Sequence, residues 1–208
     1  MEKAEQILQI KKLLHRLDTG TNVDAGEMYE NQTSNYTDKN LAGREWKTFF
    51  CDTPQIIGLS GDLSENYSFL TIQELGTPIL AVRDGKGEFH AYVNACRHRG
   101  VVVEEEERGV AKRFTCQFHR WTYDANGVLV GLPKQEHFGE IETEKFGLLE
   151  LPSEERHGLL WVHPDPNGQI DLENLLTPQL LLELETWNLQ ELDFLGSDTY
   201  DVACSWKL

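Results

Sequence analysis

The stretch CRHRGVVVEEEERGVAKRFTCQFHRW, residues 96–121, holds two of the chain's four cysteines and two of its seven histidines. They stand as two mixed pairs, Cys96 with His98 and Cys116 with His119. Thiolate and neutral imidazole both bind borderline transition metals, so the stretch predicts a metal centre held by two loops. A Cys₂His₂ zinc site usually takes both cysteines from one loop and both histidines from the other. One of each from each loop favours a binuclear centre instead.

The spacing is Cys-x-His, seventeen residues, then Cys-x-x-His, which is the Rieske [2Fe–2S] signature. The chain resembles the N-terminal half of the large (α) subunit of Rieske non-haem iron ring-hydroxylating oxygenases. The motifs that carry the resemblance are NACRHRG, CQFHRWTYDANGVLVGLP and HGLLWVHPDP. The resemblance implies that Cys96, His98, Cys116 and His119 bind a [2Fe–2S] cluster, with both histidines on one iron.

The family resemblance also implies an activity and partners. In the family, a ferredoxin or a flavin reductase delivers electrons from NAD(P)H to the cluster. The cluster passes them, usually across a subunit boundary, to a mononuclear Fe(II), where dioxygen and the organic substrate react. The parent protein is then a cytoplasmic oxidoreductase that forms a homo-oligomer, with the trimer common in the family. We expect the mononuclear site beyond Leu208, so no catalytic residue is assigned within this chain.

Composition excludes two classes of partner. The chain has 19 basic and 35 acidic residues, a formal charge of −16, which disfavours nucleic acid and anionic membranes. No run of about 18 apolar residues occurs, so no membrane span is expected. The first residues, MEKAEQILQIKKLL, lack the features of a secretion signal. A reducing, cytoplasmic location follows, in which the four cysteines are expected as metal ligands or thiols and not as disulfides.

The expected fold is mainly β: a Rieske-type antiparallel β sandwich with a cluster-binding subdomain, flanked by short N- and C-terminal helices. Three segments are predicted: an N-terminal helix and linker (1–40), the Rieske domain (41–165), and a helical connector with the first strand of a truncated catalytic domain (166–208). The Asp84-Gly85 and Asn126-Gly127 pairs predict hairpin turns.

Periodicity gives the individual elements. Helices are predicted at 4–17, 38–50 with Asp38 as cap, and 172–189. Strands are predicted at 55–59, 67–73, 78–83, 89–93, 147–151 and 159–163, with a charged turn before the last. Residues 199–208 alternate apolar and polar residues, and we predict a strand there as well.

Two further features of the sequence bear on the site. Glu154, His157 and His163 imitate the family's carboxylate and histidine ligands for mononuclear iron, but the gap between the histidines is one residue too long. We assign these three residues to structure. Tyr123 stands close enough to the second ligand pair to reach a sulfur of the cluster.

Two other functions remain open from the residues alone. A stand-alone Rieske ferredoxin would use the same four ligands, although it has no need of about forty residues on either side of the β domain. A zinc-stabilised interaction domain would also use these ligands, and would yield a colourless protein.

Overall fold

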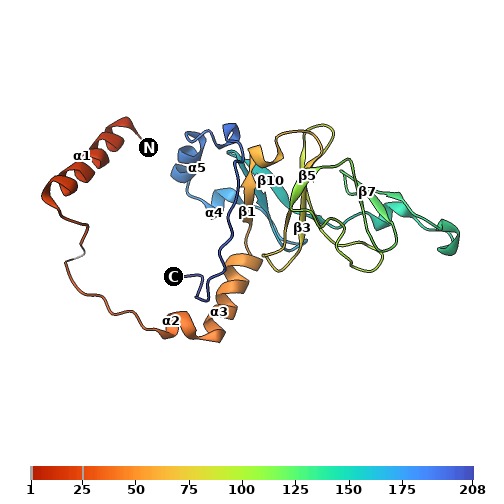
Figure 1. The fold of residues 1–208 in the computed structure, drawn as a ribbon, viewed down its shortest axis with the longest axis horizontal. Helices are drawn as coiled ribbons and strands as arrows, with labels where there is room; N and C mark the ends of the chain where they lie inside the picture. Colours follow the sequence, from red (N-terminus) through yellow and green to blue (C-terminus); the bar gives the residue numbers. More distant parts are fainter. Residues whose placement is uncertain (1, 25) are drawn as a thin grey trace. The chain divides into compact units, whose positions relative to one another are not determined.

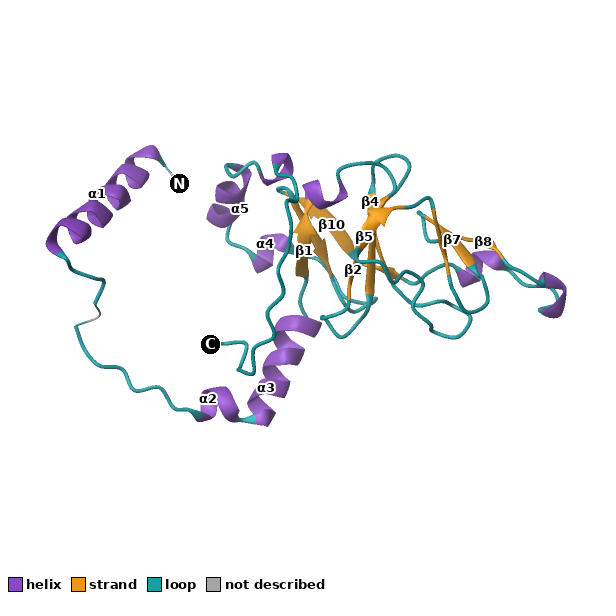
Figure 2. Ribbon diagram, in the orientation of Figure 1, coloured by secondary structure: helices purple, strands orange, loops and turns teal. Residues whose placement is uncertain are grey.

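The computed structural model describes residues 2–24 and 26–208. The chain divides into two compact units, one comprising residues 1–42 with 201–208 and the other residues 43–200. The second unit holds all of the strands (Figures 1 and 2). In the part of the chain that the structure describes, no helix combines the length and apolar character needed to cross a bilayer.

The first unit is helical. Helix α1 runs over Lys3–Thr19 and ends at Gly20, which has a left-handed φ of 65°. After an irregular segment, α2 covers Ser34–Thr37. Helix α3 (Lys39–Glu45) continues into a π-helical turn at Trp46–Cys51.

Asp38 caps helix α3, as the sequence predicted. Its Oδ1 accepts hydrogen bonds from the backbone N–H of Asn40 at 2.8 Å and of Leu41 at 3.2 Å. These two N–H groups have no acceptor inside the helix, so the Asp38 carboxylate supplies the acceptor that the first turn lacks.

The second unit contains three antiparallel sheets, with strand orders β1-β11-β10, β5-β2-β3-β4-β9 and β6-β7-β8. The strands are β1 Gln55–Leu59, β2 Ser68–Ile72, β3 Ile79–Arg83, β4 Phe89–Val93, β5 Arg108–Val110, β6 Arg113–Thr115, β7 Thr122–Asp124, β8 Leu129–Gly131, β9 Glu150–Leu151, β10 Ser153–Arg156 and β11 Leu159–Val162. This antiparallel, mainly β architecture confirms the predicted fold class.

The five-stranded sheet is buried on both faces, because successive side chains of a strand point to opposite sides. On one face, Leu70 and Ala81 pack with Leu160 of β11, which joins this sheet to β1-β11-β10 as a sandwich. On the other face, Phe69 and Leu80 belong to the same core as the β6-β7-β8 sheet. The central sheet therefore supports the sheet that carries the second cysteine–histidine pair.

Two short helices cover the outer side of the β1-β11-β10 sheet. They are α4 (Leu172–Leu175) and α5 (Pro178–Glu185), and their buried Leu172 and Leu184 pack on Trp161 of β11. The sequence predicted one helix over 172–189. The structure breaks it at Thr177, whose Oγ1 accepts from the Leu180 N–H at 3.2 Å, because Pro178 starts a new helix and cannot donate to a preceding turn.

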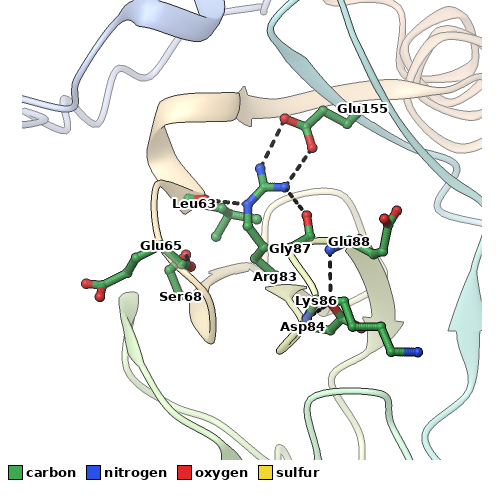
Figure 3. A network of polar contacts seen from close by, with 9 residues as sticks. All are labelled: Leu63, Glu65, Ser68, Arg83, Asp84, Lys86, Gly87, Glu88 and Glu155. Atoms are coloured by element: carbon green, nitrogen blue, oxygen red, sulfur yellow. Dashed lines mark hydrogen bonds and ion pairs between the residues drawn. The ribbon is translucent and has the colours of Figure 1, made fainter.

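Arg83 links the two sheets of the sandwich (Figure 3). Its guanidinium donates to the carbonyls of Leu63 and Gly87 and to both carboxylate oxygens of Glu155 on β10, the last two at 2.9 and 3.0 Å. Burial pushes the pKa of Glu155 up, but hydrogen bonds from Arg83 and Ser60 and the Arg83 charge outweigh it and leave the pKa below its ordinary value. Glu155 is thus held as a carboxylate.

Two further predictions about elements were wrong. The charged segment after residue 151 is strand β10, and only His157-Gly158 forms the turn before β11. Residues 199–208 form bends and turns without a strand. Alternating side chains make a strand only where a neighbouring strand takes up the backbone N–H and C=O groups, and no strand pairs with these residues in the described chain.

Candidate metal centre

The first cysteine–histidine pair lies in a closed turn between β4 and β5. The N–H of Cys96 donates to the carbonyl of Val101 at 2.7 Å, and the N–H of Gly100 donates back to the carbonyl of Cys96 at 2.8 Å. Gly100 has a φ of 71°, a left-handed conformation that glycine adopts without steric cost. These bonds fix the position from which Cys96 projects its sulfur.

The second pair lies in a turn of the same pattern between β6 and β7. The N–H of Cys116 donates to the carbonyl of Trp121 at 2.9 Å, and the N–H of Arg120 donates to the carbonyl of Cys116 at 3.0 Å. Arg120, at the position that corresponds to Gly100, also has a left-handed φ of 61°. The two loops are therefore built alike, although their sequences differ.

The four predicted ligands are brought together by these loops. The two cysteines are buried, at 4% and 2% exposed, and both belong to the same hydrophobic core. The rings of His98 and His119 are half-buried, with centroids 4.6 Å apart and an interplanar angle of 69°. The cysteine side chains thus lie inside, whereas the two imidazole rings are only partly covered.

Tyr123 of β7 supports the first loop. Its hydroxyl lies 3.3 Å from Cys96 Sγ and accepts a hydrogen bond from the N–H of Arg97 at 3.0 Å. The sequence placed Tyr123 within reach of a sulfur, and the structure puts it against that of Cys96. Trp121 stacks on His98, with ring centroids 5.0 Å apart and planes within 8° of parallel, so the imidazole is fixed in orientation.

Sequence reasoning missed an aromatic cover over the loops. Phe138 contacts the rings of both His98 and Trp121, at 5.8 and 5.6 Å between centroids. With Ile141 and Phe146 it lines a hollow of about 470 Å³ beside His98. The available signal was three large apolar residues in the otherwise polar segment 133–147.

His98 Nδ1 shows that the site fits a metal. This atom is buried and has no hydrogen-bond partner, which is costly for a polar group unless a ligand completes it. Burial lowers the pKa of His98, and the charges of His119 and Arg99 lower it further, so the ring is neutral with a lone pair free to bind a metal. Together with two buried thiols, these donors match a Rieske cluster.

No group of three or more His, Cys, Asp or Glu side chains converges on one point among residues 2–24 and 26–208. A binuclear cluster takes two protein ligands on each metal, so its ligands need not converge. Of the three residues Glu154, His157 and His163, Glu154 pairs with Arg156, with 3.6 Å between Oε1 and Nη1. His163 instead accepts a hydrogen bond at Nδ1 from the Asp165 N–H at 3.1 Å.

Residues 53–149 match the family model described as the Rieske [2Fe-2S] domain. This part of the chain, which contains both loops, belongs to that domain family. Rieske domains bind a [2Fe–2S] cluster.

Known proteins place the chain more narrowly. It is 29% identical over 175 residues to 2-aminobenzenesulfonate 2,3-dioxygenase subunit alpha of Alcaligenes sp, covering 83% of this chain and 44% of the relative. It is 34% identical over 154 residues to the anthranilate 1,2-dioxygenase large subunit of Acinetobacter baylyi, covering 71% and 32%. The structure of naphthalene 1,2-dioxygenase from Rhodococcus sp. bound to indole matches with a TM-score of 0.66 and 25% identity, covering 84% and 38%.

The chain is thus homologous to the α subunits of Rieske-type oxygenases, which are oxidoreductases. The chain spans only 31% to 44% of the length of these relatives and of other similar oxygenase subunits. These findings support the predicted family and favour it over a stand-alone ferredoxin.

Proposed function

We propose that Cys96, His98, Cys116 and His119 hold a Rieske [2Fe–2S] cluster and that the chain transfers single electrons through it. The observation that carries the proposal is the placement of the two cysteine–histidine pairs on two loops of identical hydrogen-bond pattern, with the two histidine rings 4.6 Å apart and His98 Nδ1 buried and unpartnered. The membership of residues 53–149 in the Rieske domain family supports the same assignment.

The protein's own residues prepare the site for one-electron chemistry. A bound Rieske cluster supplies an acceptor that takes up and releases one electron without breaking a bond. With two neutral imidazoles in place of two thiolates, the ligand set carries two fewer negative charges. An electron is then easier to add, so the reduction potential of the cluster is higher. The Tyr123 hydroxyl hydrogen-bonds a Cys96 thiolate, and Trp121 holds the His98 ring in place.

The parent protein is proposed to be a ring-hydroxylating-type oxygenase α subunit in the cytoplasm. Electrons from NAD(P)H would arrive through a ferredoxin or flavin reductase and continue to a mononuclear Fe(II) site for oxygen-dependent hydroxylation. Assembly as a homo-oligomer, a trimer by analogy with the family, belongs to the same proposal. The names of the similar dioxygenase subunits support it. The alternative is a stand-alone ferredoxin, which the ligands alone would also permit.

Anaerobic purification tests the cluster assignment. We expect a brown protein with iron and acid-labile sulfide in equal amounts, and an electron-spin resonance signal after dithionite reduction. Cys116→Ser is expected to abolish both, because it removes one of only two thiolate ligands. Cys51→Ser, at a half-buried cysteine outside the loops, is the matched control and should retain them. A colourless protein that contains zinc would contradict the proposal.

A further inference from the structure

The parts of the two loops that carry the proposed ligands have a charge opposite to that of the chain. Residues 95–103 and 114–123 contain three arginines, Arg97, Arg99 and Arg120, and no aspartate or glutamate. The whole chain has 35 acidic residues against 19 basic ones. Glu104–Glu107 follow directly on the first of these segments, so the positive charge is confined to the parts of the two loops that carry the proposed ligands.

These arginines are not neutralised within the chain. All three are exposed, and none forms an ion pair with a carboxylate among the described residues. Arg120 donates only to the neutral amide oxygen of Gln117, at 3.0 Å. This contact holds the guanidinium in position without cancelling its charge.

Arg120 also occupies a backbone position that favours glycine. The first loop has Gly100 at the corresponding place, with a φ of 71°, whereas Arg120 has the same closing hydrogen bond and a φ of 61°. A Cβ atom in the left-handed region is strained. Closing the loop therefore requires a left-handed backbone at position 120 but does not require an arginine there. The loop geometry thus does not explain the charged side chain.

Beside Arg120, an apolar ring is exposed to solvent. Phe118 is 57% exposed, and its ring lies 4.0 Å, centroid to centroid, from that of His119. Arg99, Phe118 and Arg120 are exposed neighbours in sequence of His98 and His119, whose rings lie 4.6 Å apart. The patch that these three residues define thus combines one large apolar side chain with two positive charges, next to the proposed ligands. Arg97 faces differently, since it borders the hollow that also contains Glu140 and Glu142.

We propose that the Arg99–Phe118–Arg120 patch is the docking surface for the acidic face of a one-electron carrier protein. The proposal rests on the proposed function and adds the residues that recognise the partner. A patch with a single large apolar side chain suits the small, transient interfaces of electron-transfer encounters more than a permanent contact between copies, which would be larger and more hydrophobic. Positive charges around such a contact guide an acidic partner and speed its association.

Binding of an acidic plant-type [2Fe–2S] ferredoxin to the holoprotein tests the proposal by calorimetry at low and high salt. We expect salt-sensitive binding, because these charges are exposed and screened over about 10 Å at 0.1 M salt. Arg120→Gln and Arg99→Gln should each weaken binding about two- to fivefold. Arg120→Lys, which keeps the charge, should retain most of the affinity. Lys86→Gln, which removes an exposed charge from the β3–β4 turn, is the matched control and should bind as the parent does.

Arg120→Gly separates recognition from folding. It should weaken binding like Arg120→Gln while raising Tm by about 2–4 °C, because the backbone strain is relieved. Binding that is absent or unchanged in the Arg99 and Arg120 variants would overturn the proposal. So would a change of self-association, seen by sedimentation, that leaves ferredoxin binding intact, since the occupant would then be a second copy. Iron, sulfide and spin-resonance measurements on the same samples report separately on the proposed function.

Discussion

The hydroxyl of Tyr123 is placed to influence the electronic properties of the site through Cys96. A phenol that donates to a thiolate stabilises the state with more negative charge, which is the reduced one. We therefore expect Tyr123→Phe to lower the reduction potential, on the order of 40 mV if about 1 kcal/mol of differential hydrogen bonding is lost. A spin-resonance redox titration measures it. Tyr92→Phe is the control, a buried tyrosine of the same core; an equal shift in both variants would contradict the assignment.

At the residue scale, the sequence indicated the candidate ligands but not their surroundings. Spacing alone indicated Cys96 and His119 with their partners, because metal ligands must be particular residue types at particular intervals. The left-handed backbone of Arg120 follows from closure of the loop and not from the residue type. The contact of Phe138 with His98 depends on a tertiary approach between segments forty residues apart, which periodicity does not encode.

At the scale of elements, the Arg83–Glu155 ion pair makes the sandwich sensitive to acid. The pKa of Glu155 is lower in the folded protein than its ordinary value of 4.5. The carboxylate therefore contributes stability that is full above pH 4.5 and is lost as the pH falls through the folded pKa. Glu155→Gln should lower the free energy of unfolding by about 1 kcal/mol at pH 7 and by less at pH 3.

Chemical denaturation across that pH range measures the effect. Glu88→Gln is the matched control, because Glu88 is an exposed carboxylate near the same arginine and no pairing with Arg83 is seen for it. A Glu155→Gln variant whose deficit stays constant from pH 7 to pH 3 would show that the carboxylate's charge is not responsible.

The turn between β10 and β11 lies against the segment after α5 and requires a glycine at position 158. Gly158 has a φ of 75°, and a Cβ there would lie 2.4 Å from the backbone nitrogen of Gln190 in the segment after α5. Gly158→Ala should therefore lower the free energy of unfolding by about 2–3 kcal/mol, through backbone strain and displacement of that segment. Gly139→Ala is the control for strain alone, because Gly139 has a φ of 69° with open space around it. Equal decreases in Tm for the two variants would show that a clash with the segment after α5 does not contribute.

How well elements could be predicted depended on their place in the sheets. The hairpin turns at Asp84-Gly85 and Asn126-Gly127 were predicted from the residue pairs, and both join adjacent strands. Strand β10, with the sequence SEER, was taken for a turn. It is an edge strand of its sheet, where charged side chains are tolerated and discourage further pairing, so an apolar pattern is absent.

At the scale of the whole strand-containing unit, the two loops rest on a framework that is stable for other reasons. The central sheet buries both faces, and Phe69 and Leu80 on one of them share a core with Cys96 and Cys116. Each loop, by contrast, is closed by only two backbone hydrogen bonds. The proposed ligands thus stand on a rigid sheet, whereas the conformation of the two loops around them depends on the metal that they bind.

Removal of the iron should therefore loosen the loops and spare the sheet. Ligand binding to a metal contributes directly to the free energy of folding of the segment that carries the ligands. After treatment with dithionite and a chelator, amide exchange at residues 96–101 and 116–121 should accelerate at least about tenfold, corresponding to about 1.4 kcal/mol of local stability. The amides of β2 and β3 should keep their protection, since their strands are held by apolar burial. Exchange by mass spectrometry, with mock-treated holoprotein beside it, makes the comparison. Uniform acceleration across loops and sheet would mean that the metal stabilises the whole unit cooperatively, against the division of the molecule argued here.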